Sequence, residues 1–510
     1  MTKSHWALQE KALTSVGVFS WYTNFMHGLH LRKKIHISWM IAALCLGVVI
    51  GVISVQYVSA SLFYSYAWLM LGIALTAVAS WRSYFIFIPV VISAGVFIGL
   101  WRGSVDQVKL TIYERLVGQT LTIKGKVGED VDLNSRSESV VRLHSLGIGN
   151  HTLPGSMYVT TKSKADIKRG DEMELQGKLA DGFGTFPAVM YQARVIKVQR
   201  PEPGDIARQV RDWFADAIRA AIPDPQASLG IGYLVGQRRA LPPELDDALR
   251  IAGLTHIVVA SGYNLTILVR FARRSFEKVS KYLSALSAGT MIVSFVAITG
   301  LSPSMSRAGL VAGLSLLAWY YGRKFHPIVL LLFAAAITLL VNPSLGWTDL
   351  GWQLSFAAFA GVMIVAPLAQ RYFFGDKKPG TIRQILGETT AAQLVTFPIL
   401  VLAFGQFSNV AILANILVLP LVPLAMLLTF IAGIGAIILP GLATAIGIPA
   451  SWLLEYMTKV AEYLASLSWA QTDLTISWWH VAVMYSIITA ACLYMWRKTN
   501  FNLRDSNLVE

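Results

Sequence analysis

The chain has 510 residues, of which 55% are hydrophobic and only 14% are charged, and its mean hydropathy is +0.54. Soluble globular chains carry about 25% charged residues, so this composition excludes an ordinary soluble protein. The net charge is +14, from 43 Lys and Arg against 29 Asp and Glu. That excess suits either nucleic-acid binding or the positive-inside bias of a membrane protein.

Residues 1–36 are predicted to be a cytoplasmic N-terminus and not a cleavable signal peptide. The apolar run begins only near Ile37, after three basic residues at 32–34, and it continues too far for a signal sequence. Three membrane spans are predicted within residues 37–103, because windows of about 17 to 20 apolar residues can cross the hydrocarbon core as helices. Three crossings from inside leave the chain outside the cell.

Residues 104–203 change character and are predicted to form an extracellular β domain. Apolar and polar residues alternate with period 2 at 120–127, 139–143, 156–160 and 193–198, and Gly, Asn and Asp turns separate these runs. About five short strands of this kind suggest a small barrel.

Residues 204–225 are predicted to be a linker and an amphipathic helix. The apolar face carries Ile206, Val210, Trp213, Phe214, Ala217 and Ile218, and the other face carries Arg208, Arg211, Asp212 and Arg219. This pattern suits a helix on the membrane surface. It suits packing against the barrel equally well.

Residues 226–498 are predicted to be a second membrane domain, followed by a cytoplasmic tail at 499–510. Apolar segments lie at about 245–271, 284–301, 305–321, 326–341, 350–369, 387–404, 411–421, 422–439, 443–466 and 478–496. With 411–421 taken as a re-entrant half-helix, the total is about 11 to 12 spans. The main basic clusters then all fall in the cytoplasm, which agrees with the positive-inside rule.

Polar and helix-breaking residues recur inside this second domain, in clusters at 260–264, 300–308, 349–355, 388–393 and 405–409. Charges and irregular backbone are tolerated at membrane depth only when they are buried in protein or face water. The five clusters together favour a water-filled path. For any single residue, local satisfaction is the alternative, as when Asp349 caps a helix.

Signatures of enzymes, cofactors and metals are weak. The glycines at 230, 232 and 236 do not have the spacing of a dinucleotide fingerprint. Ser261 lacks the glycine two residues earlier that a nucleophile elbow needs, and His256 is a distant candidate base. Cys45 and Cys492 both lie in apolar windows. The sequence therefore predicts no catalytic residue, no cofactor and no metal, and it contains no Walker motif.

Four sets of segments occur in this order along the chain: 236–245 leading to 252–256 and 260–262; 303–308; 342–343 leading to 349–356; and 404–408 leading to 413–417 and 420–421. Together they resemble the ComEC family of DNA-uptake channels of natural transformation. The resemblance covers nearly the whole chain. It implies a polytopic α-helical protein of the inner membrane, with three N-terminal spans, an extracellular OB-like barrel and a channel domain.

The family implies passage of one DNA strand into the cytoplasm. In the barrel, cations would track phosphates and aromatic rings would stack on bases. The candidates are Lys124, Lys126, Arg142, Tyr158, Lys162, Lys178, Phe186 and Arg194. Acidic residues nearly balance the basic ones in this insert, so a solvated barrel surface is the alternative.

In the channel domain, the family match points to residues that line or gate the path. They are Arg238, Arg239, His256, Ser261, Asn264, Arg307, Asp349, Gln353, Asn409 and Asn415. Arg307 lies between apolar segments, where an arginine is costly unless it meets an anion. A passing phosphate is one such partner, and Asp349 or Glu388 is the structural alternative.

The chain departs from the family in three ways. Tyr263 and Asn264 follow the Ser-Gly motif where leucine and histidine are common, and the insert has no cysteine for a loop disulfide. The chain stops at Glu510 without the metal-binding cluster of a metallo-β-lactamase-like domain, so nuclease activity is not predicted. Expected partners are single-stranded DNA, the cell membrane, a DNA receptor or pilus system outside, a separate nuclease, and a cytoplasmic ATPase or single-strand-binding protein.

Two other classes of function remain open. Broken helices and intramembrane charges also suit a secondary transporter for a small anionic solute. A membrane-embedded hydrolase would use Ser261 with His256, or Asp349 with Glu388 as an acid/base pair.

Overall fold

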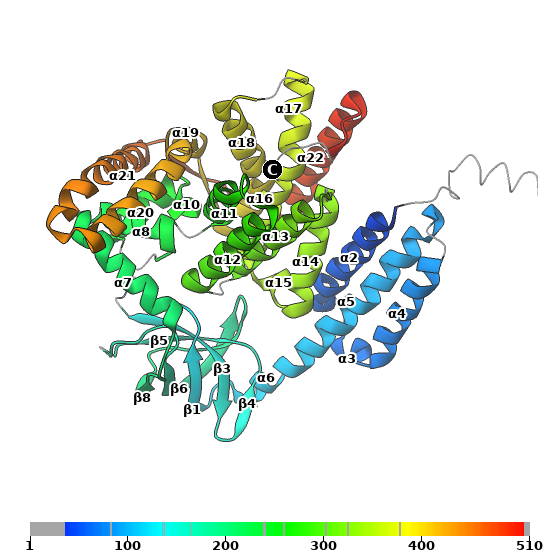
Figure 1. Cartoon of the computed structure of the whole chain (residues 1–510). Coiled ribbons are helices and arrows are strands. Elements are labelled where there is room, and N and C mark those ends of the chain that lie inside the picture. The colour runs from blue at the N-terminus through cyan, green and yellow to red at the C-terminus, as the bar shows by residue number, and fades with distance from the viewer. Residues whose placement is uncertain are drawn as a thin grey trace, which may run out of the picture. The chain divides into compact units, whose positions relative to one another are not determined.

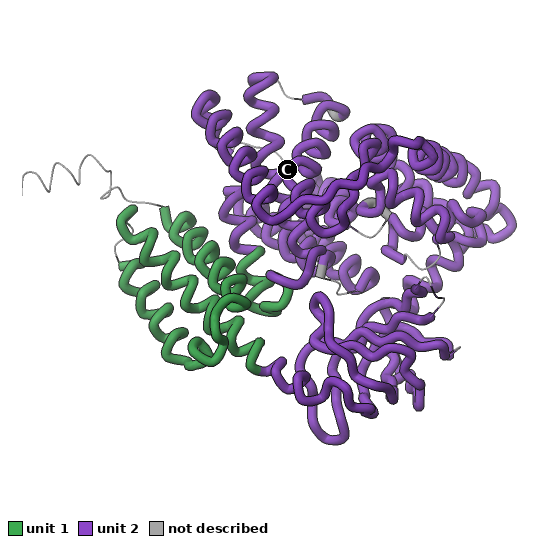
Figure 2. The backbone as a smooth tube through the Cα atoms, turned by 180° about the vertical axis from the view of Figure 1, so that it is seen from behind, with its two compact units in different colours: residues 1–108, 335–346 green, residues 109–334, 347–510 purple. Residues whose placement is uncertain are grey.

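A computed structural model of the chain describes residues 36–81, 84–134, 136, 138–163, 165–237, 241–258, 261–300, 303–323, 326–376 and 379–503. The chain divides into two compact units, which Figure 2 shows in different colours. Unit 1 comprises residues 1–108 and 335–346, and unit 2 comprises residues 109–334 and 347–510.

Unit 1 is helical. Its elements are α2 (Ile37–Ser54), η1 (Val55–Tyr57), α3 (Ala60–Phe63), α4 (Tyr66–Trp81), η2 (Phe85–Phe87) and most of α5 (Ile88–Leu110), with the end of α14 (Pro327–Val341). Helices α2 and α5 approach closely through glycines at 47, 51, 95 and 99. A Cβ added at Gly47 would collide with the carbonyl oxygen of Ile92. Such small-xxx-small pairs let helix backbones touch inside a membrane.

Unit 2 begins with α6 (Ile112–Leu116) and a β domain. Its strands are β1 (Thr120–Val127), β2 (Asp132–Leu133), β3 (Ser139–Ile148), β4 (His151–Leu153), β5 (Met157–Thr161), β6 (Glu172–Phe183), β7 (Phe186–Met190) and β8 (Arg194–Gln199). The order is β1-β3-β5-β7-β6-β8, and β6 also pairs with β1. Five strands therefore close into a barrel (Figure 1), and only the β5–β7 pair is parallel.

This strand path is a small Greek-key barrel, the class to which OB folds belong. Ile123, Leu143, Met157, Leu175 and Met190 fill its core and are fully buried. The sequence predicted β1 with its observed bounds, but it missed β6 and β7. The alternation of buried Met173, Leu175 and Leu179 is present in β6, although glycines at 177 and 182 interrupt it as turn residues would.

The rest of unit 2 is helical. It contains α7 (Ile206–Ala221), α8 (Gln226–Val235), α9 (Pro243–Ile251), α10 (Thr255–Val258), α11 (Gly262–Phe276), α12 (Lys281–Thr299), α13 (Pro303–Tyr320), the start of α14, α15 (Leu345–Thr348), α16 (Leu350–Ala360), η3 (Gly361–Val365), α17 (Ala366–Phe374), α18 (Thr381–Phe404), α19 (Ala411–Val418), η4 (Leu419–Leu421), α20 (Val422–Ile438), η5 (Pro440–Leu442), α21 (Ala443–Ala465) and α22 (Trp478–Thr499). A short ribbon joins β9 (Gln406–Ser408) to β10 (Gln471–Asp473).

Seven helices of the described chain are long and apolar enough to cross a membrane, and α4 and α14 are shorter apolar helices. This supports a polytopic membrane protein with fewer full-length spans than the 11 to 12 that the sequence predicted. The seven do not include five of the predicted spans. Helices α4, α11 and α14 have only 16, 15 and 15 residues, Arg307 interrupts the apolar run of α13, and charged residues at 455, 459 and 462 interrupt that of α21. Helix α5 also continues to Leu110, past the predicted end of the third span.

Helix α7 is amphipathic as predicted, but its charged face is the buried one. Arg208 and Arg211 are 6% and 3% exposed, whereas Ile206 and Trp213 are 60% and 58% exposed. Phe214 and Ile218 pack against α20 at Gly433. The helix therefore packs between the barrel and the membrane helices through its arginines and part of its apolar surface, and one apolar strip stays open.

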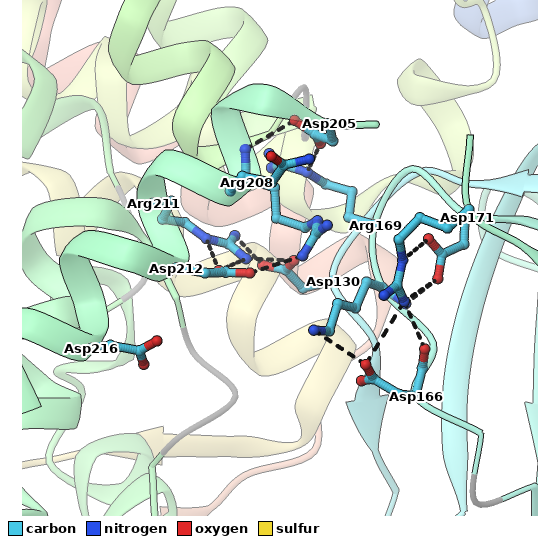
Figure 3. A network of polar contacts seen from close by, with 12 residues as sticks. Asp130, Asp166, Arg169, Asp171, Asp205, Arg208, Arg211, Asp212 and Asp216 are labelled. Carbon is cyan, nitrogen blue, oxygen red and sulfur yellow. Dashed lines mark hydrogen bonds and ion pairs between the residues drawn. The ribbon is translucent and has the colours of Figure 1, made fainter. Parts of the chain in front are cut away.

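Buried ion pairs hold α7 to the barrel (Figure 3). The Arg211 guanidinium donates to both carboxylate oxygens of Asp130, which lies in the segment between β1 and β2, and the Nη2 to Oδ1 distance is 3.0 Å. Arg208 donates to Asp212 one turn further along α7 at 3.0 Å. Bidentate arginine–carboxylate pairs are directional, so they fix the orientation of the helix on the barrel.

Arg169, in the loop between β5 and β6, connects the barrel to both α7 and α12. Arg169 is 5% exposed, and its Nε donates to Asp205, the N-cap of α7, at 2.6 Å. Its other nitrogens donate to the carbonyl oxygens of Ala297 and Ile298 in the last turn of α12, where a cation meets the negative end of the helix. Burial is the largest single influence on Asp205 and would raise its pKa, but the hydrogen bonds from Arg169 and from the Arg208 backbone N–H, together with the charges of both arginines, outweigh burial and lower that pKa.

Arg211→Gln should lower the free energy of unfolding by about 3 kcal/mol, because it leaves Asp130 without its buried partner. The double variant Arg211→Gln/Asp130→Asn should recover part of that loss. Thermal unfolding of the full chain in detergent measures both. Arg219→Gln is the matched control, since Arg219 pairs with the exposed Asp216 and a surface pair contributes less than about 1 kcal/mol. Equal effects at 211 and 219 would refute the role of the buried pair.

The open strip of α7 should contact lipid. A spin label at Val210 (Val210→Cys, with Cys45 and Cys492 replaced by Ala) should be more accessible to oxygen than to a water-soluble nickel chelate in lipid nanodiscs, because Val210 is 49% exposed beside two other apolar side chains. A label at Asp216, which is 78% exposed on the same helix, should show the opposite preference. Equal chelate accessibility at both positions would rule out lipid contact.

Candidate nucleic-acid interface and membrane path

Three aromatic rings cluster on the outside of the barrel. Tyr158 of β5 lies 5.1 Å from Phe183 and 5.8 Å from Phe186, and the two phenylalanines are 5.7 Å apart between ring centroids. Phe183 and Phe186 are register partners on either side of the tight β6–β7 turn. Phe183 remains 49% exposed. We call these three residues the aromatic cluster; it offers planar, partly open faces on which bases could stack.

Three of the predicted phosphate contacts are already paired with carboxylates. Arg142 is the register partner of Tyr158, but it binds Glu129 at 3.1 Å and Asp132 at 3.0 Å. Lys124 lies 3.9 Å from Glu174, and Lys162 lies 3.8 Å from Glu138. The acidic residues that nearly balance the insert's charge thus lie directly beside its cations.

Lys126, Lys178 and Arg194 are exposed and form no ion pair within the described residues. Lys126 lies on β1, which pairs with the β3 strand of Arg142, whereas Lys178 and Arg194 lie on β6 and β8. An open groove on the β1 side is lined by Lys124, Lys126 and Lys197, and also by Glu172 and Glu174. The structure therefore brings Arg142, Tyr158 and Phe186 together, and it places Lys124 and Lys126 in a groove whose charges are nearly balanced.

Ser261 and Asn264 act as structural groups at the start of α11. The Ser261 hydroxyl caps the helix by accepting from the backbone N–H of Asn264, and it donates to the Asn264 side-chain oxygen at 3.2 Å. Asn264 is fully buried and donates to the carbonyl oxygen of Tyr233 in α8 at 3.0 Å. Because the Ser261 hydroxyl is engaged in this cap, no observation favours Ser261 as a nucleophile. His256 lies on the short helix α10 and is exposed.

Arg307 lies in the second turn of α13 and is 3% exposed. Its Nη2 donates to the carbonyl oxygen of Gly351 at 2.8 Å, and its guanidinium lies 5.9 Å from the Phe356 ring. Asp349 caps α16 by accepting from the N–H of Trp352 at 2.9 Å. Gln353 follows in the first turn of the same helix. The structure thus brings Arg307, Asp349 and Gln353 to one region.

Glu388 is not a partner of Arg307. Its carboxylate accepts from Gln384 at 2.8 Å, and the charged groups that act on it are those of Arg270 and Tyr263. The alternative in which Glu388 neutralises Arg307 is therefore wrong, and an Asp349–Glu388 acid/base pair has no support in the contacts of either residue.

Two predicted path residues take different structural roles. Asn409 follows β9, and its side chain donates to the Trp469 carbonyl and to the Thr472 hydroxyl, at 2.8 and 2.7 Å, which ties the β9–β10 ribbon together. Asn415 is 1% exposed in α19, and its side-chain oxygen has no hydrogen-bond partner among the residues that the structure describes. Arg238 and Arg239 lie outside the described residues.

Sequence reasoning missed part of each region. Phe183 is not among the predicted contacts, although an aromatic on each side of the Gly-Thr turn could have marked it as a partner of Phe186. Gly351 and Phe356 were not singled out. Nothing in a linear pattern shows that a carbonyl oxygen and a ring from α16 meet an arginine of α13.

Comparison with known proteins adds to this geometry. The family described as Competence protein matches residues 233–498. ComE operon protein 3 of Bacillus subtilis (strain 168) is 25% identical over 256 residues, which are 47% of this chain and 31% of that protein. An uncharacterized protein of Aquifex aeolicus (strain VF5) is 23% identical over 215 residues, 41% of this chain and 49% of that protein.

The matched region spans less than half the length of either relative. No solved structure matches the chain. The family match covers more than half of the chain and contains Ser261, Arg307, Asp349, Asn409 and Asn415. The chain belongs to the competence protein family.

Proposed function

We propose that this protein is an inner-membrane channel that passes single-stranded DNA into the cytoplasm during natural transformation. The observation that carries the proposal is the family match over residues 233–498, a region that also contains buried polar groups beside helix breaks. Such groups are costly at membrane depth unless they serve a path for a polar solute. The proposal assigns no nuclease or other enzymatic activity to the chain.

In the proposed topology both termini are cytoplasmic and the barrel faces outward. The positive-inside bias supports it, because the main basic clusters then share one side. The barrel would receive the strand, and the helical domain would conduct it. A DNA receptor or pilus system, a separate nuclease and a cytoplasmic ATPase or single-strand-binding protein would act before and after this step.

On the barrel, stacking would contribute more than phosphate contacts. The aromatic cluster is partly open, whereas Arg142, Lys124 and Lys162 are already paired with carboxylates. Lys126, Lys178 and Arg194 remain as candidate phosphate contacts. Binding of this kind is independent of sequence, because every base has a face to stack.

Within the helical domain, the proposed path residues divide into two groups. Asn264, Asn409 and the Ser261 hydroxyl are bonded to the protein, so they would position helices along the path. Arg307 and Asn415 have unpartnered polar atoms and would meet the strand or its water. Arg238, Arg239, His256, Asp349 and Gln353 complete the proposed set.

Deletion of the gene should abolish transformation by added DNA while DNA still binds the cell surface, because uptake across the inner membrane would be the lost step. Counting transformants and surface-bound labelled DNA in the same cells measures the two steps separately. Complementation with the intact gene is the control. Normal transformation without the gene would refute the channel.

Phe183→Ala in the full chain should weaken binding of oligothymidylate by about 1 to 3 kcal/mol, because one stacking face is lost. Fluorescence anisotropy with detergent-solubilised protein measures the affinity. Ile196→Ala is the control, since Ile196 is 51% exposed on β8, outside the aromatic cluster. With about three unpaired cations, log K should fall with log salt with a slope of roughly −2. Equal affinity of the Phe183 and Ile196 variants would exclude the aromatic cluster.

A further inference from the structure

Arg307 carries a charge that the surrounding protein does not fully satisfy. It is 3% exposed, and among the described residues its guanidinium has one hydrogen-bond partner, the Gly351 carbonyl oxygen, which accepts from Nη2 at 2.8 Å. Nε and Nη1 are buried and have no partner within that part of the chain. A buried charge with unpaired donors costs several kcal/mol. A protein would retain such a group where a ligand completes its hydrogen bonds.

Asp349 acts on Arg307 through its field but not through a contact. Its carboxylate is committed to the N–H of Trp352 as the N-cap of α16, and the described structure contains no ion pair between the two residues. The negative charge is near enough to limit how tightly an anion binds Arg307. It therefore favours release of a bound anion.

Two helix starts lie against the second turn of α13, beside Arg307. Gly262, the first residue of the 15-residue helix α11, lies against Ala308, since a Cβ there would be 3.4 Å from the Ala308 Cβ. Gly351, in the first turn of the 11-residue helix α16, accepts from Arg307 itself. Helix N-termini carry partial positive charge and favour anions. The Phe356 ring closes another side at 5.9 Å.

We propose that Arg307 and these two helix starts form a binding site for a phosphodiester monoanion. The unpaired Nε and Nη1 lie on different edges of the guanidinium, and each would donate a charge-assisted hydrogen bond to a phosphate oxygen that reaches its edge. Asp349 opposes this binding and keeps it transient. This inference rests on the proposed function, in which the phosphodiester belongs to the passing DNA strand. A phospholipid headgroup offers the same chemistry.

The test uses the full chain in a maltoside detergent, which contains no phosphate, with dimethyl phosphate as the probe. Dimethyl phosphate should raise the thermal midpoint relative to chloride at equal ionic strength. Arg307→Gln should raise the dissociation constant for dimethyl phosphate by roughly tenfold to a hundredfold, the range for a charged hydrogen bond. The dissociation constant of Arg307→Lys should lie between those of the wild type and Arg307→Gln. Arg219→Gln, an arginine in a surface pair, should match the wild type.

Asp349→Asn should change the affinity for dimethyl phosphate in the opposite direction. Asparagine keeps the N-cap but removes the repelling charge, so dimethyl phosphate should bind more tightly than to the wild type. Asp349→Asn therefore tests the phosphodiester site even if Arg307→Gln does not accumulate as folded protein. An unchanged response in Arg307→Gln, or a weaker response in Asp349→Asn, would overturn the site.

Two further experiments distinguish a DNA phosphodiester from a phospholipid headgroup, and the failure of the site from the failure of the channel. Competition of dimethyl phosphate by oligothymidylate, but not by an oligomer with an uncharged methylphosphonate backbone, supports a DNA strand. Competition only by added anionic phospholipid would assign the site to lipid and overturn its role in the path. If deletion abolishes transformation while Arg307→Gln transforms normally and still responds to dimethyl phosphate, the site fails and the channel stands. Normal transformation after deletion would overturn the channel instead.

Discussion

The arrangement of unit 2 depends on a small number of buried arginine–aspartate contacts between the barrel and the helices. Arg211 on α7 binds Asp130 in the barrel, and Arg169 joins Asp205 to the carbonyl end of α12. Bidentate and charge-assisted bonds are directional, whereas apolar packing is not. A barrel attached by these bonds keeps one orientation relative to α7 and α12.

This attachment has a consequence for the proposed path. Helix α12 ends at Thr299, and α13, which carries Arg307, begins at Pro303. Arg169 therefore holds the helix end that immediately precedes the helix of the proposed phosphodiester site. The barrel and the path are linked by one short stretch of chain, and the link is made through backbone carbonyls that would otherwise lack partners at the end of a helix.

The barrel and the path also differ in how they would meet a nucleic acid. On the barrel half of the candidate cations are paired with carboxylates, so the open aromatic faces would provide much of the contact. At Arg307 the reverse holds, because the guanidinium is buried and incompletely bonded while its surroundings are apolar or backbone. Stacking tolerates any base, and a phosphate contact tolerates any sequence, so both suit a protein that passes DNA without reading it.

The sequence by itself determined the membrane class, the place of the β insert and the bounds of β1, because hydropathy and period-2 alternation are local properties of the chain. It also determined that α7 has two faces, and that Arg307 needed a partner. Only the tertiary structure decided that the arginine face of α7 is buried, that β6 closes the barrel, and that Gly351, not Glu388, accepts from Arg307. These outcomes depend on which distant segments meet, and no local pattern records where a buried charge finds its partner.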